Sequence, residues 1–271
     1  MRRLRTPIAW VFTALYLFPI YWMVITALKS PRDVFAIPPQ LVPQPPTLQG
    51  FQDAVMGNEA VFNGILNSLV IGTGSLILTL LLGTPAAYAL ARMKLWFTGF
   101  VILIMLGAQM LPSINLALPM FAIFARVDLL DTYTALIIAN VALTLPFSII
   151  IVRPYFLSVP GDLINAAVVD GCTPFGALWR VVLPLVRPGV VVTAALTFLT
   201  AWGEFVFGLT LATSEDMQPI TVVLNRFIAQ FGTRWNELMA VSTVIALPIV
   251  VTFLLAQRHI VAGLTAGATK E

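Results

Sequence analysis

Long runs without a charged residue constrain the fold of this chain more than any other feature of its sequence. Five runs contain no Asp, Glu, Lys or Arg, and a sixth contains only Glu204; they are residues 6–28, 60–91, 95–125, 132–152, 238–257 and 188–214. Each run is near or above the ~20 residues that a helix needs to cross the bilayer core. We therefore predict six membrane-spanning helices, at residues 6–28, 62–91, 96–125, 132–157, 189–213 and 237–257.

The composition favours the same fold class. The 271 residues are 59% hydrophobic and only 10% charged, whereas soluble domains carry about 25% charged residues. A sheet is excluded, because an open sheet cannot satisfy its backbone in lipid and the runs lack the alternation of barrel strands. The first run is longer than the ~7–15-residue core of a signal peptide, so we expect it to be retained. The prediction is an all-α integral membrane protein, with one transmembrane domain over residues 1–271.

Several function classes are excluded by what the sequence lacks. The net charge of +3 is too small and too scattered for a nucleic-acid-binding surface. One Cys and one His exclude an internal disulfide and argue against a zinc site. No Gly-Lys dipeptide occurs, so there is no Walker A phosphate loop. With no catalytic triad or metal-binding set visible, we predict no enzyme activity, catalytic residue, metal or cofactor in this chain.

The distribution of Lys and Arg predicts the orientation, because cytoplasmic loops carry an excess of both. With a cytoplasmic N-terminus, the inner side holds ten of the 15 basic residues and the outer side holds five. The inner set is Arg2, Arg3, Arg5, Arg92, Lys94, Arg153, Arg180, Arg187, Arg258 and Lys270; the outer set is Lys29, Arg32, Arg126, Arg226 and Arg234. We predict a multi-pass protein with both termini in the cytoplasm.

Residues 159–188 are the longest stretch between spans in the second half, and they are expected in the cytoplasm. Their pattern predicts two short helices joined by a tight turn. Ser158 can cap the start of the first helix. Asp170-Gly171 predicts its end, because Gly adopts the left-handed conformation without a Cβ clash. Ala166 and Ala167 present almost no side chain, so the backbone of another protein could approach closely.

The second short helix is expected to begin at Thr173-Pro174, as N-cap and first helical residue. Leu183-Pro184 and Pro188-Gly189 are expected to close the segment. A helix-turn-helix with a small-residue face, placed between two membrane spans, indicates a docking element for another protein.

The segment N-A-A-V-V-D-G-C at 165–172, followed by V-V-L-P at 181–184, resembles the EAA loop of permease subunits in bacterial ABC importers. Asn165 stands where that family usually has Glu, and Cys172 where it usually has Ala. The motifs Y-W-M-V-I-T-A-L-K-S at 21–30, A-A-Y-A-L-A-R at 86–92, A-W-G-E-F at 201–205 and V-A-G-L-T-A-G-A-T-K at 261–270 are similar to the maltose-type sugar permeases. The resemblance extends over nearly the whole chain.

This resemblance implies the type I importer permease fold, in which the 159–188 loop couples the spans to an ATPase. The residues implied in coupling are Asn165, Ala166, Ala167, Asp170, Gly171 and Cys172. It also implies a bacterial cytoplasmic (inner) membrane location and an assembly with a second homologous permease, two ATPase subunits and an extracytoplasmic solute-binding protein. ATP and Mg would belong to the ATPase, and the solute would be a sugar or sugar-like compound.

Three features within the spans are candidates for a solute path. Glu204 is expected to be the only carboxylate in a span, where a charge is expensive unless it faces water or the bundle interior; it could equally lie at the outer interface. Trp202 belongs to the same group, in which Gly203 replaces the usual Asn of the family.

The second feature is Gln109 to Pro119, which contains Asn115 and interrupts the third span. Irregular backbone at depth lines a cavity or is buried in protein, although an ordinary proline kink would explain it too. The third is Asn140 and Thr144, on one face of the fourth span, which could instead join helices by hydrogen bonds.

An ATP-independent secondary transporter or channel is the main alternative, but it would need several ionisable residues inside the membrane. A membrane-embedded enzyme is a weaker one. The Pro-rich segment 31–59 is expected to be extended and external, either as a connector or as a contact surface for an external binding protein.

Overall fold

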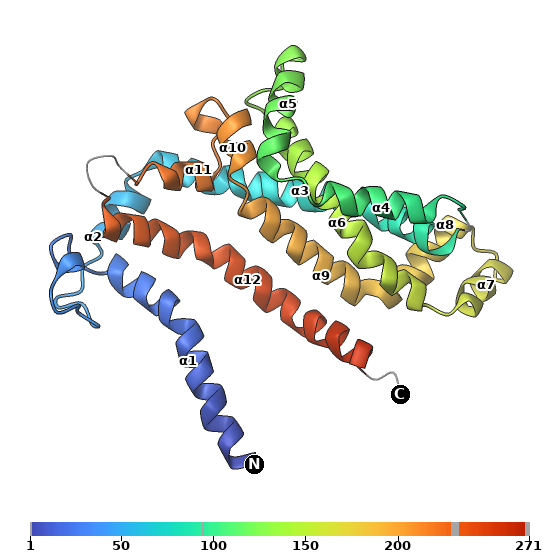
Figure 1. Cartoon of the computed structure of the whole chain (residues 1–271), viewed down its shortest axis with the longest axis horizontal. Coiled ribbons are helices and arrows are strands. Elements are labelled where there is room, and N and C mark those ends of the chain that lie inside the picture. Colours follow the sequence, from blue (N-terminus) through green and yellow to red (C-terminus); the bar gives the residue numbers. More distant parts are fainter. Residues whose placement is uncertain (1, 94, 229–232, 269–271) are drawn as a thin grey trace. The chain divides into compact units, whose positions relative to one another are not determined.

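The computed structural model describes residues 2–93, 95–228 and 233–268. Its described residues form helices and turns without any strand (Figure 1). Lys94 and Lys270, which the orientation count places on the inner side, lie outside the described residues. The chain divides into two compact units, one of Met1–Leu66 with Pro219–Pro248 and one of Asn67–Gln218 with Ile249–Glu271.

The first unit begins with α1 (Arg2–Ala27) and includes the start of α3 (Glu59–Arg92), α11 (Ile220–Asn225) and the start of α12 (Trp235–Ala268). After α1, Lys29 is 1% exposed, and its ammonium lies 4.6 Å from the centre of the Trp22 ring. A Cβ at Gly50 would lie 2.9 Å from the Asn236 carbonyl oxygen and 3.2 Å from that of Ala27. Only glycine permits the chain to pass this closely between the two backbones.

The Pro-rich segment 31–59 is less extended than its sequence predicts. It contains the single turn η1 (Asp33–Phe35) and a helical stretch made of α2 (Gln49–Phe51) and the π-helical η2 (Gln52–Met56). Residues 36–47 carry five of the six prolines of this segment and form no helix. This middle part lacks helix because proline removes backbone donors there.

The second unit is built around α3, α6 (Tyr133–Ser158) and α9 (Leu183–Trp202). Small residues allow the helices to approach closely: a Cβ at Gly72 would lie 3.0 Å from the Phe198 ring, and one at Gly83 would lie 3.0 Å from the Ser148 hydroxyl. Such small-residue contacts are typical of helix packing in membranes, where apolar burial alone gives no driving force.

The third predicted span, 96–125, is not one straight helix. It is divided into α4 (Thr98–Ala108) and α5 (Ser113–Arg126), whose axes differ by 96° (Figure 1). The break falls at residues 109–112, where Pro112 adopts an extended backbone and precedes the first residue of α5. Pro119 lies inside α5 without ending it, so the first proline of the interrupted stretch causes the break.

The fifth predicted span, 189–213, begins and ends too late. Helix runs without interruption through α8 (Pro174–Ala177), the π-helical η3 (Leu178–Val182) and α9, and then stops before Gly203. Pro184 and Pro188 therefore lie inside a helix and do not close the preceding segment, which corrects that expectation. Membrane helices tolerate proline because neighbouring groups and local π adjustments satisfy the freed carbonyls, and η3 directly precedes these prolines.

The other four predicted spans each correspond to one long helix, namely α1, α3, α6 and α12. The described residues contain five helices that are long and apolar enough to cross a membrane, or six if α4 and α5 together form one broken span. The chain is therefore an all-α integral membrane protein.

A polar contact in the second unit joins the α5–α6 connection to the segment that follows α10 (Val206–Leu211). Asp131, which adopts a left-handed backbone (φ 58°), accepts hydrogen bonds from the Ser214 backbone N–H at 2.7 Å and from the Thr213 hydroxyl. Partial burial raises the pKa of Asp131, but these hydrogen bonds outweigh it and hold that pKa below its usual value of 3.8.

Candidate functional site

The end of α7 (Gly161–Val169) is a tight, fully hydrogen-bonded turn. Gly171 has a φ of +87°, as its position predicts. Its N–H donates to the Val168 carbonyl at 3.0 Å, and the Cys172 N–H donates to the Ala167 carbonyl at 2.9 Å. These two bonds form a Schellman motif, in which the left-handed residue satisfies the last carbonyls of a helix.

The next helix begins at once with α8, where the Thr173 hydroxyl accepts from the Gly176 N–H at 3.0 Å. This confirms Thr173 as an N-cap. Ser158 does not cap α7, because it belongs to the last turn of α6 and its hydroxyl donates to the Tyr155 carbonyl at 2.8 Å. We refer to residues 161–177 as the α7–α8 corner.

The residues predicted for coupling do not all face outward. Asn165, Ala166, Asp170 and Gly171 are exposed, and Cys172 is half-buried. Ala167, however, is only 6% exposed, because α7 packs on α8 and η3. The prediction that Ala167 belongs to an exposed small-residue face is therefore wrong. Apolar side chains are exposed on the corner instead, including Val169 at 87% and Phe175 at 63%.

Two arginines fix the base of the corner to the long helices. The Arg92 guanidinium, at the end of α3, donates to the backbone carbonyls of Phe156 and Val159, which link α6 to α7. The Arg153 Nε of α6 donates to the Leu90 carbonyl of α3 at 3.2 Å. Sequence reasoning used both arginines only to assign orientation. Their positions at the ends of apolar runs could have indicated that they bind helix-terminal carbonyls.

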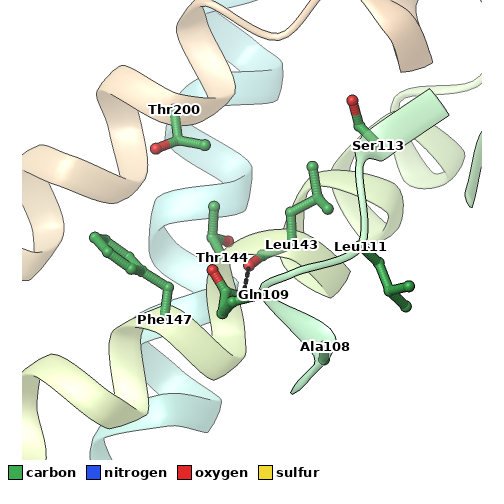
Figure 2. A pocket seen from close by; sticks show the side chains of 8 residues that line it. All are labelled: Ala108, Gln109, Leu111, Ser113, Leu143, Thr144, Phe147 and Thr200. Atoms are coloured by element: carbon green, nitrogen blue, oxygen red, sulfur yellow. Dashed lines mark hydrogen bonds between the residues drawn. The ribbon is translucent and has the colours of Figure 1, made fainter. Parts of the chain in front are cut away.

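A second feature is a cavity of about 310 Å³ at the break between α4 and α5 (Figure 2). Gln109 projects from the break towards α6, where its amide Nε2 donates to the Leu143 carbonyl at 3.0 Å. This leaves the Gln109 amide oxygen available as an acceptor. The lining residues are Ala108, Gln109, Leu111, Ser113, Leu143, Thr144, Phe147 and Thr200.

Of the predicted path residues, the cavity brings together only Gln109 and Thr144. The Thr144 hydroxyl already bonds the Thr79 hydroxyl of α3 at 2.8 Å and donates to the Asn140 carbonyl at 2.9 Å. The Asn140 amide donates to the Leu136 carbonyl at 2.9 Å, and Asn140 is 2% exposed. These contacts favour the interhelical use of the Thr144 side chain over a solute contact.

Like Asn140, the remaining predicted path residues lie outside the cavity lining. Asn115 is exposed in the first turn of α5, and Trp202 is 1% exposed and stacks on Phe198. Glu204 lies between α9 and α10 and not inside a spanning helix. Its carboxylate accepts from the N–H groups of Val206, Phe207 and Gly208 at 2.8, 2.8 and 3.3 Å, so it caps the short helix α10.

Sequence reasoning missed Ser113, Phe147 and Thr200 as members of this cavity. Ser113 lies within the interrupted stretch that the sequence did single out. Phe147 and Thr200 carry no such signal, because an aromatic residue and a lone hydroxyl are common on any membrane helix.

The long apolar helices, the broken span and the ordered corner between two spans define the class, a multi-span α-helical membrane protein. Residues 79–266 match the model of the binding-protein-dependent transport system inner membrane component, and the chain belongs to this family of ABC importer permeases.

Relatives extend over almost the whole chain. The trehalose transport system permease protein SugB of Mycobacterium tuberculosis is 35% identical, over 94% of this chain and 92% of the relative. The sulfoquinovosyl glycerol transport system permease protein SmoH of Agrobacterium fabrum is 33% identical, over 94% of this chain and 89% of the relative. A crystal structure of a bacterial ABC transporter that imports the acidic polysaccharide alginate matches with a TM-score of 0.80 at 18% identity, over 94% of each chain. This last similarity shows the fold.

Proposed function

We propose that this chain is one of two homologous permease subunits of an ATP-driven importer for a sugar or sugar-like solute. The other components are two ATPase subunits, which hold ATP and Mg, and an extracytoplasmic binding protein. Support for a carbohydrate comes from the relatives, since SugB and SmoH are named for trehalose and for sulfoquinovosyl glycerol. Both termini and the α7–α8 corner lie in the cytoplasm, in keeping with the excess of basic residues on that side.

The observation that carries the proposal is the construction of the α7–α8 corner. Its outer surface exposes Val169 and Phe175, which is the apolar surface that a soluble partner would cover. Its base is fixed by Arg92 to the carbonyls at the end of α6. Closure of the ATPase pair on ATP would therefore displace the corner, and the displacement would pass to α3 and α6 and move the spans between inward- and outward-facing states.

A matched pair of glycine substitutions tests the coupling role. A Cβ at Gly171 or at Gly161 meets no atom within 4 Å, but only Gly171 has a positive φ. We expect Gly171→Val to strain the turn by about 1–2 kcal/mol or more, and to lower binding-protein-stimulated ATPase activity of the reconstituted complex by about fivefold or more. Gly161→Val should leave it unchanged. Equal stimulation in both variants would remove the corner from the coupling mechanism.

A surface substitution tests the docking face without changing the backbone. Val169→Asp places a charge on a side chain that is 87% exposed, so the permease should insert normally but retain less ATPase through purification. Uptake that continues without any ATPase subunit would instead support the ATP-independent alternative.

The cavity at the α4–α5 break is the place where we expect this subunit to contact the solute. The free Gln109 amide oxygen and the Ser113 and Thr200 hydroxyls can bond sugar hydroxyls, and Phe147 offers an apolar ring beside them (Figure 2). Gln109→Leu and Thr200→Val should raise the KM of uptake while binding of solute to the external protein stays the same. Unchanged uptake kinetics in both variants would place the contact on the other permease.

A further inference from the structure

A groove of about 380 Å³ runs along η3 and the first half of α9, apart from the cavity and next to the α7–α8 corner, since the Trp179 ring lies edge to face with the Phe175 ring at 5.9 Å between centroids. It is lined by Trp179, Leu183, Pro184, Arg187 and Val190. All of its lining residues come from one helical stretch within the candidate span Phe175–Trp202. The groove therefore opens towards whatever surrounds this span.

Arg187 is the unusual member of this groove. It lies twelve residues into the candidate span, it is exposed, and among the described residues no acidic side chain pairs with it. Arg92 and Arg153, by contrast, bond backbone carbonyls. A cation on an apolar helix is costly unless an anion or water meets it, so the environment of the groove must supply one.

The position of Arg187 indicates where that anion lies, because Arg187 comes only four residues after Leu183, the first residue of α9. Side chains on a helix lean towards its N-terminus, and α9 begins on the side that carries the α7–α8 corner. Long basic side chains near a helix end extend to the membrane interface in this way. Trp179 lies eight residues earlier and is 41% exposed, and Trp is enriched at the headgroup level. With the α7–α8 corner on the cytoplasmic side, an orientation that rests on the proposed function, the two side chains frame the headgroup region of the cytoplasmic leaflet.

We propose that this groove binds an anionic phospholipid of the cytoplasmic leaflet. The Arg187 guanidinium pairs with the lipid phosphate, which matches the planar donor geometry of arginine. Leu183 and Val190 take the adjoining part of an acyl chain, and Trp179 lies beside the headgroup. The proposal goes beyond the import function, because lipid binding requires neither the solute nor ATP.

Lipid titration of the whole importer complex in detergent tests this site. Phosphatidylglycerol and phosphatidylcholine with the same acyl chains are added separately, and the melting temperature is followed. We expect a saturable rise with phosphatidylglycerol only. Arg187→Gln should raise the half-saturating concentration by about fivefold, the effect of one arginine near an anionic surface. Arg187→Lys should retain the preference for the anionic lipid.

Arg258→Gln is the matched control, because it removes one exposed positive charge from α12 without touching the groove, and it should titrate like the wild type. If Arg187→Gln fails to assemble, Val190→Trp fills the groove and should weaken saturation by phosphatidylglycerol. Equal stabilisation by both lipids overturns the proposal. So does wild-type titration by Arg187→Gln, or a photo-crosslink from position 187 to another subunit in place of lipid.

Discussion

Among the glycines of the second unit that the structure describes, Gly189 leaves the least room for a side chain and gives the sharpest stability prediction. A Cβ on Gly189 of α9 would lie 2.4, 2.5 and 2.8 Å from three ring atoms of Tyr155 on α6. An aromatic ring cannot bend away as a flexible chain end can, so the helices must separate. Such overpacking costs about 1–3 kcal/mol, and the better helix propensity of alanine offsets about 0.5–1 kcal/mol of it. Gly189→Ala should therefore lower stability by about 1 kcal/mol or more.

The assay is thermal unfolding of the detergent-solubilised importer, where a loss of this size corresponds to roughly 2–4 °C. Gly107→Ala is the control, because a Cβ there meets nothing within 4 Å, and it should unfold at the wild-type temperature or above. Tyr155→Ala should be less harmful in the Gly189→Ala background than alone, since the clash is then absent. A Gly189→Ala variant that unfolds with the wild type would refute the close packing of α6 and α9.

Three further predictions concern single contacts. Thr144→Val leaves the buried Thr79 hydroxyl without its partner at 2.8 Å and should lower stability by about 1 kcal/mol. The double variant Thr79→Val, Thr144→Val should lose less stability than the two single variants together, and thermal unfolding of the wild type and the three variants checks this. Hydrogen bonds lower the folded-state pKa of Asp131 below 3.8. The stabilisation of the folded state by this carboxylate is therefore complete above pH 3.8, and it is lost as the pH falls through the lowered pKa. The melting temperature of Asp131→Asn should thus fall less steeply than that of the wild type on acidification. Ala167→Trp should expose the α7–α8 corner to protease, because residue 167 is buried; protection equal to the wild type would contradict that burial.

The sequence predicted the parts of the fold that depend on local patterns. Apolar runs identified α1, α3, α6 and α12, and the Asp170-Gly171 and Thr173-Pro174 pairs identified the turn of the corner, because each rests on backbone geometry within a few residues. Proline was the main source of error. Pro112 lies in a break between two helices, whereas Pro184 and Pro188 lie inside one continuous helix. The difference lies in the surrounding helices and the π-helical turn, which a local pattern does not contain.

The candidate sites depended more on tertiary packing. The exposed Ala166 and the buried Ala167 are adjacent alanines, and only the packing of α7 on α8 and η3 separates them. Glu204 was chosen because a carboxylate in a span is costly, but the break after α9 gives it three backbone N–H donors. The cavity at the α4–α5 break depends on contacts with α6 and α9; the sequence indicated the interrupted span and, through Thr144, the fourth span, but it did not indicate α9.

The turn of the corner also places the single cysteine of the chain where a spectroscopic probe would be most informative. Cys172 directly follows Gly171, and its N–H is held by the Ala167 carbonyl. Its thiol is half-buried and forms no disulfide. A nitroxide or fluorophore attached to the native thiol would report from a position rigidly joined to the end of α7. Displacements of the corner could thus be followed through the nucleotide cycle by distance spectroscopy, without first engineering this subunit to remove other cysteines.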